Sequence, residues 1–191
     1  MQRELGESYE ALLSQIKTGS VTPEKVRDVT LIPLVGDVKL VIACDSNASI
    51  GEKKNDYYKN AYEEVAVSAM KVPLMEVLAT GAVPVVVVDN LCMEMEGAGK
   101  RIISIMRRQL EEAGLSNVQL TGSTEDNMPT TQSGFGVTAI GLLQMQDCRI
   151  ASTRRGDRVV CVGVPRSGIN DLPEGSLHGG MGVLAQNAEI L

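Results

Sequence analysis

Residues 38–44 place the strongest limit on how this 191-residue chain can fold. Apart from Lys39 they are β-branched or apolar, so the strand that they predict is apolar on both faces. Residues 29–34 are joined to this segment by Val35, Gly36 and Asp37, which is a hairpin signal. We therefore expect residues 38–44 to form a central strand of a sheet.

The remaining apolar segments alternate between helical and strand-like patterns. Apolar residues recur at helical spacing in three segments, 7–17, 60–80 and 98–113. Gly81 and Gly114 are expected to close the second and third helices, and Pro73 to kink or restart the second. Further strands are predicted at 85–88, 118–120, 136–143 and 158–164. The order β-β-α-β-α-β-β and a last strand predicts an α/β (α+β) fold with helices on one sheet face.

Composition excludes several classes of protein. Charged residues make up 22% of the chain and hydrophobic ones 43%, which is ordinary for a soluble globular protein. A net charge of −6 argues against nucleic-acid binding. The N-terminus lacks a signal peptide and no apolar run is long enough for a bilayer. The four cysteines are widely spaced, so we expect buried, reduced thiols in a cytoplasmic protein.

A polar stretch at residues 121–131 is the first candidate site. It lies between two strand-like segments and has no apolar side chain before Met128. Glu125 and Asp126 are adjacent, so in an extended loop they point in opposite directions, and we favour Glu125 as a metal ligand. Asn127 is suited to donate to a phosphate or ribose oxygen.

Three more carboxylates are candidates for the same metal site. Asp45 follows the central strand, Asp28 precedes the first strand, and Glu76 lies in an otherwise apolar helical segment. A carboxylate in such a segment must be paired, metal-bound or at a helix end. Mg²⁺ prefers oxygen ligands, so carboxylates from several elements are chemically suitable. Asp45 as a turn residue and Asp28 as a solvated charge are the purely structural alternatives.

Other polar residues have weaker patterns. Lys53 and Lys54 lie in a long polar loop, 45–59, and are either phosphate contacts or a solvated pair. Asp89 and Asn90 end a buried strand and are candidates for nucleotide or substrate contacts. His178, the single histidine, has no carboxylate pattern beside it, so no general-base role is expected.

Five segments in order resemble the N-terminal domain of the aminoimidazole ribonucleotide (AIR) synthase superfamily. They are a strand ending in Asp (42–46), a helix closed by a Gly-Ala-x-Pro turn (72–84), a Gly loop ending in Met-Pro (122–129), the strand after it (134–141) and a Gly-Asp strand (155–160). The superfamily includes AIR synthase and thiamine-monophosphate kinase. Residues 51–53 and 89–94 are similar to its α-ribazole kinase branch of cobalamin salvage.

The resemblance implies a helical extension at 1–25, an ATP-binding domain at 26–165 and the start of a C-terminal domain at 166–191. It also implies a homodimer whose sheets pair into a barrel. The implied site binds ATP and Mg²⁺. Its implied metal ligands are Asp28, Asp45, Glu76 and Glu125, and its implied catalytic residues are Lys53 and Asp45. Its implied nucleotide contacts are Asp89, Asn90, Gly122, Thr124 and Asn127. Thr124 departs from the family, which has an acidic residue there.

The function expected from this resemblance is that of an ATP- and Mg²⁺-dependent small-molecule kinase such as α-ribazole kinase. A ligase or cyclase of the AIR synthase kind is one alternative. A nucleotide-binding dimerisation domain without activity of its own is another. The small-molecule acceptor is not identified by the sequence.

Overall fold

The computed structural model describes residues 2–161. The elements in chain order are α1 (Gln2–Lys17), β1 (Glu24–Val26), β2 (Val29–Pro33), β3 (Val38–Ala48), β4 (Ile50–Gly51), β5 (Tyr58–Lys59), α2 (Tyr62–Ala79), β6 (Val83–Leu91), η1 (Met95–Gly99), α3 (Lys100–Glu112), β7 (Gln119–Thr124), β8 (Gly134–Gln144) and η2 (Met145–Asp147). None of the helices within these residues is long and apolar enough to cross a membrane.

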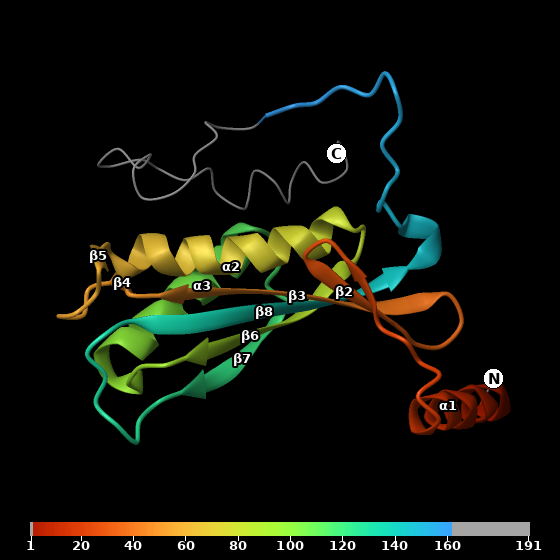
Figure 1. Ribbon diagram of the computed structural model, residues 1–191, viewed down its shortest axis with the longest axis horizontal. Helices are drawn as coiled ribbons and strands as arrows, with labels where there is room; N and C mark the ends of the chain where they lie inside the picture. The colour runs from red at the N-terminus through yellow and green to blue at the C-terminus, as the bar shows by residue number, and fades with distance from the viewer. Residues whose placement is uncertain (1, 162–191) are drawn as a thin grey trace.

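Six strands form one mixed sheet in the order β1-β2-β3-β8-β6-β7 (Figure 1). The β6 and β7 strands run parallel, and the other neighbours are antiparallel. The β4 and β5 strands form a separate parallel pair beyond the end of β3. The predicted α/β class with a mixed sheet is therefore confirmed, and β3 is central as expected.

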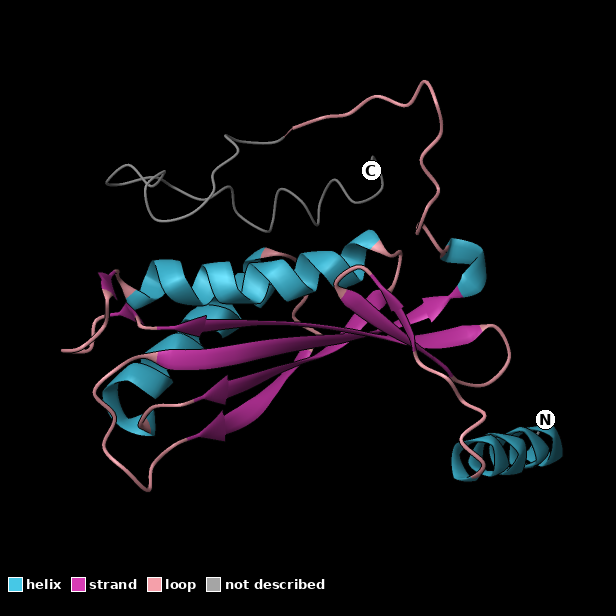
Figure 2. Cartoon of the chain, viewed as in Figure 1, coloured by secondary structure: helices cyan, strands magenta, loops and turns pink. Residues whose placement is uncertain are grey.

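Helices α2 and α3 cover one face of this sheet (Figure 2). The inward side chains alternate along the strands, so that Val41 and Ala43 of β3 lie beside Val137 and Ala139 of β8 in the core. Buried residues of the helices complete that core: Met70, Leu74, Val77, Ile102 and Met106. Each helix is followed by a glycine with positive φ, Gly81 at 90° and Gly114 at 73°, as predicted.

The opposite face of the sheet, here called the open face, is covered by no helix of residues 2–161. Its apolar side chains are only partly buried, and Leu142 is 40% exposed. The open face carries these apolar residues on β2, β3, β6 and β8: Ile32, Leu40, Ile42, Val86, Ile140 and Leu142. Helix α1 stands away from the sheet, and its Tyr9 and Ile16 are exposed (Figure 1).

Several predicted boundaries were wrong. The β3 strand continues to Ala48, so Asp45 lies inside a strand rather than at its end. Thr121 to Thr124 belong to β7, because strand pairing with β6 orders this polar edge. Helix α2 runs through Pro73 without a break, since the proline removes a single amide donor and its ring is fully buried.

Other expectations were wrong or lie outside the described residues. The thiols of Cys44, Cys92 and Cys161 are exposed rather than buried, Cys44 because it points to the open face. Residues 158–161 form no strand, and residues 162–164 of that predicted element are not described. His178 and the predicted C-terminal segment 166–191 also lie outside the described residues.

Candidate functional site

Two of the predicted acidic residues lie in one row across the sheet. Asp45 of β3 pairs with Val137 of β8, which pairs with Asp89 of β6, which in turn pairs with Gly122 of β7. The alternation of buried residues places both carboxylates on the face that the helices cover. On each of these two strands, a position that would normally carry an apolar core side chain therefore carries a carboxylate.

The first cluster, here called the carboxylate cluster, consists of Asp28, Asp45 and Glu76. Oε2 of Glu76 on α2 is buried and has no hydrogen-bond partner. Burial raises the pKa of Glu76, and the negative charges of Asp28 and Asp45 raise it further. The structure thus brings three of the four predicted metal ligands within electrostatic reach. As they stand, no three His, Cys, Asp or Glu side chains of residues 2–161 are close enough to hold a metal ion.

Glu125, the fourth predicted metal ligand, lies elsewhere in the chain. Its amide donates to the carbonyls of Leu91 (3.0 Å) and Met93 (3.1 Å), just beyond the end of β7. Its carboxylate accepts from the Asn127 amide at 2.8 Å. Because β8 and β6 separate β7 from β3, the distance to Asp45 spans three strand spacings of about 4.8 Å each. One chain alone does not bring Glu125 to the carboxylate cluster.

Asp89 is the most deeply buried of the predicted site residues. It is 2% exposed and its Oδ1 has no hydrogen-bond partner. Burial raises the pKa of its carboxyl group, and the positive charge of Arg107 opposes that rise in part. A Cβ on Gly122 would lie 2.4 Å from this Oδ1, so only glycine fits beside Asp89. The sheet itself therefore requires Gly122, independently of any phosphate contact.

The other predicted nucleotide contacts lie near the ends of β6 and β7. Asn90 is exposed and pairs across the sheet with Gly136. The Thr124 hydroxyl donates to Asp126 at 2.8 Å, and the same carboxylate accepts from the Met95 amide at 2.8 Å. Asn127 is exposed in the loop that follows.

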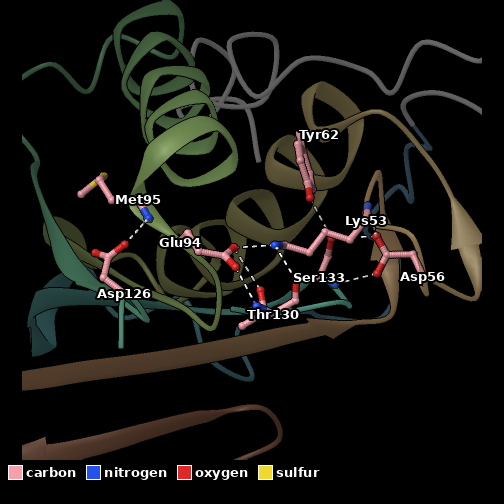
Figure 3. Close-up of polar contacts among 8 residues, drawn as sticks. All are labelled: Lys53, Asp56, Tyr62, Glu94, Met95, Asp126, Thr130 and Ser133. Atoms are coloured by element: carbon pink, nitrogen blue, oxygen red, sulfur yellow. Dashed lines mark hydrogen bonds and ion pairs between the residues drawn. The ribbon is translucent and has the colours of Figure 1, made fainter. Parts of the chain in front are cut away.

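The second cluster, here called the lysine cluster, joins Lys53 to Glu94 and Thr130 (Figure 3). The Lys53 ammonium donates to Oε2 of Glu94 at 2.5 Å and to the Thr130 carbonyl at 3.0 Å. Glu94 also accepts from the Thr130 amide at 2.6 Å and from its hydroxyl at 3.1 Å. The Lys53 ammonium, and next the Thr130 amide, lower the pKa of Glu94 to about 2.

A buried aspartate, Asp56, joins the loop that contains Lys53 to the loop that contains Thr130 and Ser133. Asp56 accepts from the Ser133 amide (2.6 Å), the Ser133 hydroxyl (2.7 Å) and the Lys53 amide (2.8 Å). Burial raises the pKa of Asp56, but these hydrogen bonds outweigh it and hold the pKa below its ordinary value. Ser133 also shares a hydrogen bond with the Tyr62 hydroxyl at 2.9 Å (Figure 3). Hydrogen bonds therefore hold residues 51–59 and 130–133 together.

The sequence analysis identified Lys53 but missed Glu94, Thr130 and Asp56 as its neighbours. The hydrogen bonds among Lys53, Glu94 and Thr130 join positions 36 to 77 residues apart in the sequence. The bond between Asp56 and Ser133 joins positions 77 residues apart. Glu94 alone carried a signal, because it is a carboxylate between Met93 and Met95 at the end of a buried strand.

No protein-family model and no curated protein matches the chain. Among solved structures it is similar to thiamine monophosphate kinase from Aquifex aeolicus (18% identity, TM-score 0.47), covering 73% of this chain and 44% of that chain. It is also similar to AaThiL complexed with AMPPCP and TMP (16%, 0.43; 70% and 41%). A third is T. maritima PurL complexed with ATP (11%, 0.43; 62% and 20%). The chain spans less than half the length of each of these proteins.

Proposed function

We propose that this chain is the nucleotide-binding part of an ATP- and Mg²⁺-dependent small-molecule kinase. The observation that carries this function is the unpaired, buried oxygen of Glu76 beside two further carboxylates. Carboxylates that repel one another in a partly buried place lack a counter-cation. The AMPPCP and the ATP of the similar structures are bound to those proteins, so the support comes from this chain's own residues.

Mg²⁺ fits the carboxylate cluster by the chemistry of its donors. It takes hard oxygen ligands in an octahedron and keeps several waters, so it needs only one or two carboxylates directly. Asp45 and Glu76 would hold it, and Asp28 would act directly or through water. Bound there, the ion would supply positive charge to the phosphates of ATP. Because the three carboxylates do not yet converge, small side-chain movements must accompany binding.

The residues of the chain would act mainly by position and charge. In phosphoryl transfer the protein aligns the reactants and neutralises charge that is spread over the phosphate oxygens. Lys53 is the catalytic cation in this scheme, since its ammonium is fixed on one side and has a third N–H left to donate. Asp45 would orient the metal side of the phosphates. Asp89, Asn90, Thr124 and Asn127 remain proposed nucleotide contacts, while Gly122 allows Asp89 its place.

We propose the open face as the surface on which two copies pair. Partly exposed apolar side chains on neighbouring strands form a continuous patch there, which is typical of a protein interface. A charged side chain at the centre of this patch should prevent two copies from pairing without disturbing the core under the helices. Leu142→Lys is therefore expected to convert a dimer to a monomer in light scattering, with thermal unfolding little changed. A wild-type chain that is monomeric at all concentrations would contradict the pairing.

Calorimetry tests the proposed function in two steps. Titration with ATP should show binding in the presence of Mg²⁺ and at least tenfold weaker binding with EDTA. The protein is then incubated with Mg·ATP and either α-ribazole or thiamine monophosphate, and phosphate transfer is measured. Transfer to α-ribazole would confirm the finer assignment, which the sequence resemblance supports. Absence of ATP binding would overturn the function, and binding without transfer would identify a nucleotide-binding module.

A further inference from the structure

The Glu94 carboxylate of the lysine cluster is held by several donors at once. Three groups converge on the Glu94 carboxylate: the Lys53 ammonium at 2.5 Å, the Thr130 amide at 2.6 Å and the Thr130 hydroxyl at 3.1 Å (Figure 3). All three are donors, and one of them is a cation. Donors arranged in this way suit any compact oxyanion, and a phosphate group offers the same acceptor chemistry with more charge.

Three lysines lie close together in the sequence around this site, in a chain whose net charge is −6. Residues 51–59 contain Lys53, Lys54 and Lys59 together with the acidic Glu52 and Asp56, so this segment carries one net positive charge (three minus two). Lys59 donates to the carbonyls of Lys53 and Lys54, which holds the loop backbone in place. The Lys53 side chain is 16% exposed and that of Glu94 is 31% exposed, so the pair is enclosed but reachable from solvent.

The backbone around Glu94 is held in place, so only its side chain would have to move. The Gly99 amide donates to the Glu94 carbonyl at 3.1 Å, and Asp126 accepts from the Met95 amide at 2.8 Å. Glu94 lies beyond the end of β6 at Leu91, so its carboxylate can leave the lysine cluster by rotation of the side chain without unfolding a strand.

We infer that Glu94 is a placeholder that occupies an anion site formed by Lys53 and Thr130, and that an incoming phosphate group displaces it. This inference rests on the proposed function for its physiological ligand, a nucleotide or phosphorylated substrate. Displacement would free Glu94 only when a phosphate has arrived, so Lys53 is kept in place and shielded until then. Because Glu94 is ionised at any pH above about 2, the site is opened by a competing anion and not by a proton.

Inorganic pyrophosphate is the probe for this site, and Glu94→Gln is the variant that tests it. Glutamine keeps an acceptor oxygen for the Thr130 amide but removes the competing charge. Because a salt bridge that is partly open to solvent contributes little, removing the competing charge should have a modest effect, and we expect pyrophosphate to bind about fivefold more tightly to Glu94→Gln than to the wild type. The gain should disappear in Glu94→Gln combined with Lys53→Met. Thermal unfolding of each variant checks that it is folded.

Glu96→Gln is the matched control. Glu96 pairs with Lys100 at the same 2.5 Å, two positions along the chain, but both side chains are largely exposed. Glu96→Gln removes the same charge as Glu94→Gln. If Glu96→Gln leaves the pyrophosphate affinity unchanged, a general effect of net charge is excluded. A Glu94→Gln affinity equal to or weaker than that of the wild type, including no binding at all, would overturn the inference, as would a gain that survives Lys53→Met.

The same titrations with Mg·ATP separate this inference from the proposed function. If the wild type binds Mg·ATP but Glu94→Gln shows no gain for either ligand, the placeholder role is wrong and the proposed function stands. If no protein binds Mg·ATP while the Lys53-dependent gain for pyrophosphate appears, the placeholder role stands and the proposed function is wrong.

Discussion

The carboxylate cluster and the lysine cluster are opposite solutions to placing acidic side chains in a folded chain. Glu76 lies beside Asp28 and Asp45, and its pKa is raised by burial and by their charges. Glu94 lies beside Lys53 and Thr130, and its pKa is lowered to about 2. One cluster lacks positive charge, whereas the other already contains its own cation.

This contrast assigns different ligands to the two places. A cluster of carboxylates that repel one another gains from a cation, because the ion relieves both their repulsion and the desolvation of Glu76. A carboxylate satisfied by a lysine gains nothing from a cation, but its lysine is available to an anion. A magnesium–phosphate complex would supply both charges, which agrees with the Mg·ATP that we propose as the ligand.

The largest effect is expected from Asp56→Ala, which would separate the two loops that hold the lysine cluster. Alanine leaves the buried Ser133 amide and the partly buried Lys53 amide without their acceptor, at a cost of about 3 kcal/mol in the free energy of unfolding. Denaturant unfolding measures this loss. Asp157→Ala is the control, since Asp157 accepts from the amide three residues before it at 2.7 Å but is exposed. Equal losses in the two variants would show that Asp56 does not join the loops.

A smaller effect of opposite sign is expected from Glu76→Gln. Removing a charge that burial and two neighbouring carboxylates disfavour should raise the free energy of unfolding by up to about 1 kcal/mol. The same change should weaken Mg·ATP binding, because a ligand is lost. Thermal unfolding with and without Mg·ATP measures both consequences. If Glu76→Gln is less stable than the wild type and still binds Mg·ATP, the proposed difference between the two clusters is wrong.

The smallest effect is expected from acid. The folded pKa of Glu94 lies below its ordinary value of 4.5, so the stabilisation that it contributes is fully present above pH 4.5 and is lost as the pH falls toward about 2. The difference in stability between wild type and Glu94→Gln should therefore shrink across that range. Denaturant unfolding at several pH values measures it. A difference that is constant with pH would show that the Glu94 charge does not stabilise the fold.

The sequence predicted the sheet and the carboxylate cluster better than the loops. Nearly unbroken apolar runs identify β3 and β8, and apolar residues at helical spacing identify the two covering helices. Glu76 was found because a carboxylate in an apolar helix is conspicuous. The bonds of Lys53 to Glu94 and of Asp56 to Ser133 join positions 41 and 77 residues apart, and no local pattern records them. A strand was predicted at 118–120, but its polar continuation through Thr121 to Thr124 was missed for the same reason, since pairing with β6 defines that part of β7.

The central claim is that the carboxylate cluster holds a divalent cation. A titration of the protein with Mn²⁺, followed by electron paramagnetic resonance of the free ion, measures this without any nucleotide. The wild type is predicted to bind one Mn²⁺ that Mg²⁺ displaces, and Asp45→Asn is predicted to bind it at least tenfold more weakly. Equal Mn²⁺ affinity in the wild type and in Asp45→Asn would contradict the claim.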